Sequence, residues 1–296
     1  MHPSMDEIAK AAYHRWQRRE CAHGRHDEDW IAAERDLTFG LNYRWAVRHG
    51  LRPTTSESAL VWLGESSGTT RRCRFCERSA PATSFDGRHA AFPAYLGNTR
   101  LMAWEECDDC RAQYDEHLDG PFESFASPLL GLDPDLDALG TVVPVAALKA
   151  LVRMGLTILP EEEFDQFDDA VEWVSNPDDD RDTALMDGLG LGCHVYVTPE
   201  PVPSPFASLA RRLDDDARFP YMAFFLGTGR VVFQTHLPFC PRDEELDEAD
   251  RTGPVLSLSM GRGGDFRSSQ VRFLPMASPE FSVPRAFFQT VGAWHS

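Results

Sequence analysis

The 296-residue sequence lacks any apolar run of the length that a transmembrane helix needs. Its first residues, Met1 to Lys10, also lack the pattern of a secretory signal peptide. Cysteine is scarce, with seven in the chain, and nothing in the sequence indicates an oxidising compartment. We therefore expect a protein of the cytoplasm that has no membrane partner and keeps its cysteines reduced.

Positive charge is also in short supply, because the chain carries a formal net charge of −18. This balance argues at first against a nucleic-acid partner. The charge is unevenly spread, however: residues 1–70 carry −1, residues 71–111 carry +1, and residues 112–296 carry the whole −18. The first part of the chain is therefore compatible with weak, salt-sensitive DNA binding, and the acidic C-terminal part with a protein partner.

The length allows one large domain or two to three small ones, and the apolar content allows a sizeable core. Apolar residues at helical spacing predict a helical hairpin domain over residues 1–52, with a further short helix over 38–52. Turn-forming residues predict a linker over 53–70, interrupted by an apolar run at 59–63. A zinc-binding segment over 71–117 and a C-terminal domain over 118–296 complete the chain.

The C-terminal domain is predicted to pack helices on an antiparallel sheet, so the fold class is α+β. Apolar residues predict a helix over 144–158, and Pro160 with Glu161 to Glu163 begins another, since acidic residues suit the positive end of a helix dipole. Strands are predicted at 193–198, 221–226, 231–236, 255–260 and 271–274, with a hairpin turn at 227–229. The glycines at 261–264 are interpreted as a turn, because a phosphate loop would need a lysine and a following helix.

Two CxxC pairs stand in the middle of the chain. Cys73 and Cys76 form the first, Cys107 and Cys110 form the second, and thirty residues separate them. Four thiolates that converge from two tight turns satisfy the tetrahedral coordination of a structural Zn²⁺. The alternative, ordinary buried or disulfide-bonded cysteines, is disfavoured by the repeated spacing.

Two other groups resemble metal sites less well. Cys21, His23 and His26 lie in one short turn without a fourth ligand nearby, which is more typical of an exposed loop. The carboxylates between Asn176 and Asp182 lack the glycine and the terminal glutamate of a calcium loop, so a solvated acidic loop is favoured.

Two resemblances to known families follow from these motifs. The N-terminal residues resemble a short bacterial domain of unknown function through Ala12, Tyr13, Trp16, Gly24, Arg25, Asp29, Trp30, Ala33 and Glu34. Around the cysteine pairs stand Cys73-Arg-Phe-Cys76, Thr83-Ser-Phe85, His89, Pro93-Ala-Tyr-Leu96-Gly97-Asn98 and Glu106-Cys107-Asp-Asp-Cys110. These motifs resemble the HNH endonuclease superfamily, in the variety with a four-cysteine zinc knuckle. The resemblance implies a treble-clef or ββα-metal fold, in which a β-hairpin and a helix surround the zinc.

HNH enzymes hydrolyse phosphodiesters with a histidine base and a divalent ion. The resemblance implies His89 as the base, Asn98 as the residue that orients it or a turn, and His117 as a ligand of catalytic Mg²⁺ or Mn²⁺. The chain departs from the family at Ala90, where the histidine is usual, and at Arg111, where an asparagine is usual. His89 and Asn98 also have plainer interpretations, as a surface histidine and a turn residue.

Arginines make the zinc segment locally basic, and we expect them to contact the DNA backbone: Arg71, Arg72, Arg74, Arg78 and Arg88. The sequence therefore favours a metal-dependent DNA endonuclease of the HNH type. Two alternatives stay open. One is a catalytically degenerate zinc module that binds DNA or a protein without cleavage, and the other is a protein–protein adaptor.

Overall fold

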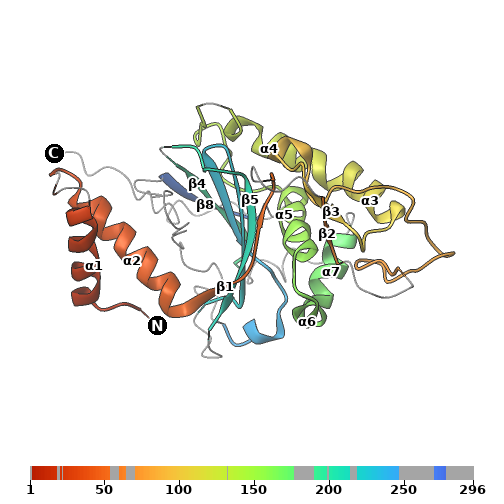
Figure 1. The fold of residues 1–296 in the computed structure, drawn as a ribbon, viewed down its shortest axis with the longest axis horizontal. Helices are drawn as coiled ribbons and strands as arrows, with labels where there is room; N and C mark the ends of the chain where they lie inside the picture. The colour runs from red at the N-terminus through yellow and green to blue at the C-terminus, as the bar shows by residue number, and fades with distance from the viewer. Residues whose placement is uncertain are drawn as a thin grey trace.

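The structure is a computed structural model that describes residues 2–18, 21, 23–53, 60–64, 71–131, 133–176, 190–198, 200–213, 219–246 and 270–277. Its fold is mixed α+β, as the sequence predicts. Figure 1 shows a helical hairpin on one side of a central sheet, and on the other side helices that carry the cysteine-rich segment. None of the described helices combines the length and the apolar character needed to cross a bilayer.

Helices α1 (Met5–Arg18) and α2 (His26–Asn42) form the predicted hairpin. Ser4 and Glu7 form a capping box at the start of α1: the backbone N of Ser4 donates to the Glu7 carboxylate at 2.8 Å, and the backbone N of Glu7 donates to Ser4 Oγ at 3.3 Å. The buried Arg15 of α1 pairs with Asp36 of α2. Local capping and one buried ion pair thus fix this unit.

The helix predicted over 38–52 is wrong after Asn42, because the next residues form strand β1 (Tyr43–Gly50). β1 pairs antiparallel with β5 (Phe206–Arg212), a strand that the sequence did not predict. Tyr43, Trp45 and Val47 alternate with exposed neighbours, which is the period of a strand. Pairing with a distant strand outweighs the weak helical pattern here. Residues 43–50 therefore lie in the same sheet as the C-terminal strands.

The sheet is antiparallel throughout and has the order β1-β5-β6-β7-β4-β8. Strands β4 (Gly192–Val197), β6 (Met222–Thr228), β7 (Val231–His236) and β8 (Gln270–Pro275) confirm four of the predicted strands. Gly229, with a φ of 54°, supplies the left-handed backbone of the predicted hairpin turn. The predicted strand at 255–260, the glycine turn at 261–264 and most of the acidic loop at 176–182 lie outside the described residues.

Helix α5 (Val145–Thr157) packs against the sheet, and its residues are buried from Ala147 to Thr157. A Cβ atom at Gly155 would lie 2.7 Å from the Leu237 side chain and 3.2 Å from that of Phe224. Glycine therefore lets this helix approach the sheet closely. The helix predicted from Pro160 onwards is divided into α6 (Glu161–Phe164) and α7 (Asp168–Ser175) by a 3₁₀ turn, Asp165–Phe167.

The cysteine-rich segment contacts this helical layer. Strand β2 (Val61–Leu63) pairs in parallel with β3 (Leu101–Ala103), so the apolar run within the predicted linker is a strand. Helix α3 (Asp108–Tyr114) continues through a π-helical turn, Asp115–Asp119, into α4 (Gly120–Ala126). Residues 54–59 and 65–70 of the predicted linker lie outside the described residues.

Candidate metal centre

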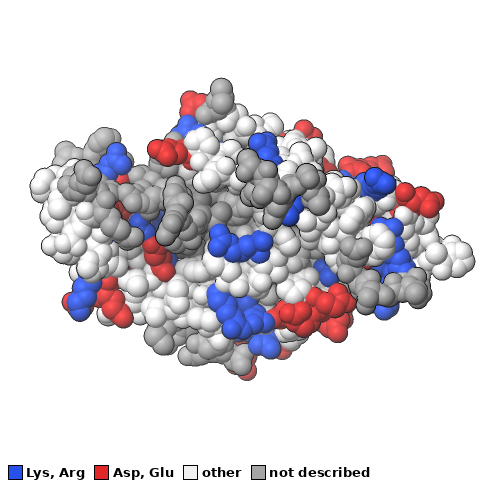
Figure 2. All heavy atoms as spheres, viewed as in Figure 1, with Lys and Arg blue, Asp and Glu red and all other residues white. Residues whose placement is uncertain are grey.

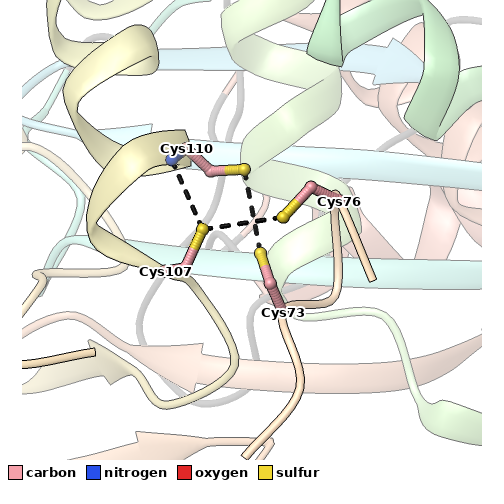
Figure 3. A group of neighbouring side chains, drawn as sticks. All are labelled: Cys73, Cys76, Cys107 and Cys110. Atoms are coloured by element: carbon pink, nitrogen blue, oxygen red, sulfur yellow. Dashed lines mark hydrogen bonds between the residues drawn. The ribbon is translucent and has the colours of Figure 1, made fainter. Parts of the chain in front are cut away.

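The first cysteine pair lies in a tight turn that the backbone closes on itself. The backbone N of Glu77 donates to the carbonyl of Cys73, and the backbone N of Cys73 donates to the carbonyl of Arg78, both at 2.8 Å. Glu77 adopts a φ of 59°, in the left-handed region that favours glycine. This turn points the thiols of Cys73 and Cys76 toward a common centre, as Figure 3 shows.

The second pair comes from the start of α3. Cys107 is the N-cap residue, and its Sγ accepts a hydrogen bond from the backbone N of Cys110 at 3.5 Å. One helical turn therefore places both thiols at the same helix end. The positive end of the helix dipole at this position favours the thiolate form.

The four sulfurs converge, as Figure 3 shows, and lie within 4.8 Å of one another. Sγ of Cys73 is 3.8 Å from that of Cys110, and Sγ of Cys76 is 3.6 Å from that of Cys107. A disulfide requires about 2.05 Å, so these cysteines are free. A tetrahedral ion with metal–sulfur bonds of about 2.3 Å requires sulfur separations of about 3.8 Å. The four cysteines therefore fit a tetrahedral metal ion.

Their mutual proximity opposes the ionisation of all four thiols. The hydrogen bond between the Cys73 and Cys110 sulfurs lowers the pKa of Cys73 to about 4 and raises the pKa of Cys110 far above its usual value. Burial raises the pKa of Cys107. Thiolates repel one another when they are this close, and a bound cation removes the repulsion. Arg78 adds positive charge, because its Nε lies 3.4 Å from the Cys76 sulfur.

His89, the predicted base, is paired with an aspartate beside the metal ligands. Its Nε2 lies 2.6 Å from Oδ1 of Asp108, the residue after Cys107. The same carboxylate accepts hydrogen bonds from Ser84 Oγ and from the backbone N atoms of Asp86 and Gly87. These bonds, that from Ser84 first, hold the pKa of Asp108 well below its usual range. The side chain of His89 is 14% exposed.

Asn98 is buried, and its amide is fully used within its own loop. Its Nδ2 donates to the carbonyls of Phe92 and Leu101 at 3.0 Å. Its Oδ1 accepts from the backbone N atoms of Arg100 and Leu101. These bonds agree with the interpretation of Asn98 as a turn residue. Among the hydrogen bonds of the described residues, none joins the Asn98 amide to His89.

His117, the third predicted catalytic residue, lies on the π-helical turn with 41% of its side chain exposed and Glu116 as its ion-pair partner. Among the residues that the structure describes, the four cysteines are the one group of three or more His, Cys, Asp or Glu placed to hold a metal. A second group that includes His89 or His117 is therefore not formed within these residues. Cys21, His23 and His26 likewise form no such group within the described residues.

The five predicted DNA-contacting arginines divide into two sets. Arg74 donates to the carbonyls of Leu156 and Leu159 at the end of α5, both at 2.9 Å, and its side chain is 8% exposed. Arg71 lies between the rings of Phe85 and Trp104. These two arginines hold the segment together.

The remaining three arginines are exposed: Arg72, Arg78 and Arg88. Two of them face carboxylates, with Arg72 2.7 Å from Glu77 and Arg78 3.1 Å from Asp109. The predicted basic front therefore has three surface cations, two of which are partly neutralised.

Sequence reasoning missed a buried ion pair that joins the metal centre to α5. Both nitrogen–oxygen contacts between Arg153 NH2 and the Glu106 carboxylate measure 3.0 Å, and the two side chains are 0% and 1% exposed. Glu106 directly precedes the ligand Cys107. The signal in the sequence was a lone arginine in the apolar stretch that forms α5, since a buried charge needs a partner.

A family model described as Protein of unknown function (DUF2934) matches residues 3–38. The match covers α1 and most of α2, which are also the residues of the first resemblance drawn from the sequence. No curated protein and no solved structure matches the chain. The family match therefore concerns the hairpin, and the function of the cysteine-rich segment has to be inferred from its geometry.

Proposed function

We propose that the protein is a zinc-stabilised, HNH-like protein that binds nucleic acid without cutting it. Zn²⁺ is the proposed ion, because four cysteine thiolates form a closed tetrahedral set that is typical of structural zinc. The order of the elements supports a treble-clef arrangement: a cysteine turn, antiparallel pairing of residue 90 with residue 102, and a helix that begins at the second cysteine pair.

The proposal of a nucleic-acid partner rests on the HNH-like motifs and on local charge. The three exposed arginines Arg72, Arg78 and Arg88 belong to a segment that carries no excess of acid, unlike the C-terminal part of the chain. Exposed arginines bind phosphate oxygens through their planar guanidinium groups. Binding through so few cations would be weak and would fall with rising salt.

The observation that favours binding over cleavage is the set of hydrogen bonds made by Asn98. Both its donors and its acceptor serve the backbone of residues 92–101, so the residue stabilises a loop. The described residues also hold no second metal-binding group beside His89. A phosphodiester hydrolysis of the HNH type needs both a base and a divalent ion at the same phosphate.

A plasmid assay tests this conclusion. The full-length protein, loaded with zinc, is incubated with supercoiled plasmid and Mg²⁺ or Mn²⁺, and binding is followed by gel shift in the same samples. We expect a shift without nicking, and equal binding by His89→Ala. Nicking by the wild type that disappears in His89→Ala would contradict the proposal.

A DNA endonuclease is the second candidate, and the pairing of His89 with Asp108 favours it. A carboxylate bound to a histidine fixes the ring and stabilises its protonated form, as a general base requires. Mg²⁺ or Mn²⁺ would supply charge stabilisation at the phosphate when bound. If this candidate is correct, Asp108→Asn should lower the cleavage rate and leave DNA affinity nearly unchanged, because the pair acts on proton transfer.

A further inference from the structure

The two short sulfur contacts at the metal centre both cross from one cysteine turn to the other. Sγ of Cys76 lies 3.6 Å from that of Cys107, and Sγ of Cys73 lies 3.8 Å from that of Cys110. Figure 3 shows that each contact joins the first turn to the start of α3. Each pair is therefore placed for a disulfide across the centre, which forms when the two sulfurs approach to about 2.05 Å.

The four thiols of the centre differ in their access to solvent. Cys73, Cys107 and Cys110 are 1%, 0% and 4% exposed, whereas Cys76 is partly exposed. Cys76 directly precedes Glu77, whose side chain lies at the surface. Oxidation of a thiol requires access to the sulfur. A small oxidant dissolved in water therefore reaches the sulfur of Cys76 before any other sulfur of the centre.

A positive charge lies beside the Cys76 sulfur, within the mixture of basic and acidic side chains that Figure 2 shows on the surface of the protein. Nε of Arg78 donates to this sulfur at 3.4 Å, and NH2 of Arg78 lies 3.1 Å from Oδ2 of Asp109. The Asp109 carboxylate also accepts a hydrogen bond from Thr83 Oγ1 at 3.1 Å, so the guanidinium has a fixed partner. Partial exposure, a neighbouring positive charge and a second thiol within reach are typical of cysteines that react with peroxides.

We propose that Cys76 is a modification site for hydrogen peroxide and that Cys107 is its resolving cysteine, so that oxidation turns the metal centre into a disulfide and releases the ion. The inference does not depend on nucleic-acid binding. It rests on the proposed zinc ion for the release alone, because the disulfide follows from the positions of the two sulfurs.

The reaction has two steps. The Cys76 thiolate attacks one oxygen of the peroxide, the O–O bond breaks, and Cys76 becomes a sulfenic acid while a hydroxide ion leaves. The Cys107 thiolate then attacks the Cys76 sulfur, an S–S bond forms, and a second hydroxide ion leaves. The two thiolates thus supply the two electrons that reduce one molecule of peroxide.

Disulfide formation removes two of the four thiolate ligands. Cys73 and Cys110 remain, and two thiolates do not complete the tetrahedral set of a structural ion. The new bond links the first cysteine turn to the start of α3, so the two turns stay joined after the ion has left. Reduction of the bond restores all four ligands, which makes the change reversible.

Treatment of the full-length, zinc-loaded protein with hydrogen peroxide tests the inference. Released zinc is followed with a chromogenic chelator. At each time point the remaining free thiols are blocked, and the protein is digested with trypsin without reduction and analysed by mass spectrometry. Trypsin places Cys73 in peptide 73–74, Cys76 in peptide 75–78, and both Cys107 and Cys110 in peptide 101–111.

Two features of the sequence sharpen this assay. Cleavage before Asp108 separates Cys107 from Cys110, so each disulfide is assigned to single cysteines. Cys21 is exposed and lies in peptide 20–25, so its oxidation is an internal standard for an accessible thiol.

Two matched variants keep a complete ligand set and differ in the thiol that they lack. Cys76→His and Cys110→His each leave three cysteines and one histidine, a set that also binds structural zinc. We expect Cys76→His to release zinc about tenfold more slowly than the wild type, because its remaining thiols are buried. Cys110→His keeps Cys76 and Cys107 and should release zinc as fast as the wild type. Zinc content and circular dichroism before treatment establish that each variant is folded.

In the wild type we expect about one zinc ion to be released for each disulfide between Cys76 and Cys107, because that bond removes two ligands of one ion. Dithiothreitol with added zinc should restore the zinc content, which distinguishes the disulfide from irreversible oxidation of the thiols. If a variant holds no zinc, the disulfide map of the wild type decides by itself.

Three outcomes would overturn the inference. One is oxidation of Cys21 while Cys76 stays reduced and zinc stays bound. Another is a first disulfide that joins Cys76 to Cys73 instead of Cys107. The third is equal zinc release from Cys76→His and Cys110→His. A wild-type protein without zinc before treatment would instead contradict the proposed zinc ion, and the disulfide map would still decide which sulfurs react.

Discussion

Strands β2 and β3 have three residues each, whereas β5 and β6 in the sheet have seven. β5 and β6 are buried along nearly their whole length and share a core with α5. The cysteine-rich segment has short elements, a seven-residue helix and four thiols at its centre. Elements this short do not bury enough surface to be stable alone. Phe75, Phe92 and Leu101 of the segment lie in the core that the sheet shares with α5, so we expect the segment to depend on a metal cross-link in addition to this packing.

Removing a metal ligand should have the largest effect and should separate the two regions. We expect Cys107→Ser to lose its zinc and to unfold the residues around it, since binding of structural zinc supplies about 10–16 kcal/mol of folding free energy. Hydrogen exchange measures this region by region. Backbone amides at 73–110 should lose protection, while those of β6 and β7 keep it.

Cys193→Ser is the matched control, because Cys193 is a buried cysteine of β4 outside the metal centre. It should keep its zinc and its protection at 73–110. Full protection of that segment in Cys107→Ser would show that packing alone holds it, and the contrast between the two regions would fail.

Breaking the buried ion pair between the regions should have the next largest effect. Arg153→Met removes the closest partner of the buried Glu106 carboxylate and leaves it Arg111 at 3.7 Å, so we expect a loss of up to about 3–5 kcal/mol in the free energy of unfolding. Urea denaturation of zinc-loaded protein measures it. The double variant Glu106→Leu, Arg153→Met should lose clearly less, because no charge stays unpaired. Equal losses in the single and double variants would mean that the lost stability comes from the packing of the two side chains and not from an unpaired charge.

The sheet should respond to acid through a buried histidine. Burial, followed by the charges of His236 and Arg35, lowers the pKa of His194 to about 3, and the residue is 5% exposed. His194 is thus neutral in the folded state, and protonation favours unfolding. Its contribution is fully present above pH 6.5 and is lost as the pH falls towards 3, by about 1.4 kcal/mol per pH unit at most.

Urea denaturation between pH 7 and pH 5 measures this slope. His194→Gln should flatten it, and the exposed-site control His14→Gln should leave it unchanged. An unchanged slope in His194→Gln would place the acid sensitivity at other groups, among them His236 of β7, whose pKa burial lowers to about 4.

The smallest effect concerns how closely a helix approaches the sheet. Gly155→Ala puts a methyl group within 2.7 Å of Leu237 and 3.2 Å of Phe224, so we expect a loss of about 1–2 kcal/mol despite the better helix propensity of alanine. Gly120→Ala in α4 has open space around the new atom and should gain up to about 1 kcal/mol. Thermal unfolding shows whether each variant is less or more stable than the wild type. A gain of stability in both variants would mean that α5 packs more loosely against the sheet than described.

Local patterns predicted the parts that depend on neighbours in sequence. The capping box, α5, the β6–β7 hairpin and the cysteine pairs all have short-range signals, and all are present. β1 and β5 are paired although about half of the chain separates them. Neither strand was predicted, because such strands form through pairing with a distant strand and not through a local sequence pattern. The partner of the buried Arg153, Glu106, could be named only once the packing of α5 was known.

The candidate site shows the same division. The four metal ligands could be named from the spacing of the cysteines, because two CxxC turns typically place four thiols around one metal ion. The functions of Arg71 and Arg74 could not, because their cation–π and carbonyl contacts involve residues up to 90 positions away. Charge counts over the sequence likewise placed five arginines in one basic front, whereas the fold uses Arg71 and Arg74 for contacts within the protein.

Elemental analysis of the reduced, purified full-length protein, paired with Cys107→Ser prepared in the same way, tests the central claim most directly. The claim is that four thiolates hold one structural zinc ion. We expect about one zinc per chain in the wild type and almost none in the variant, because three remaining thiolates do not complete the tetrahedral set. A folded wild-type sample without zinc, or equal zinc in both proteins, would contradict the account.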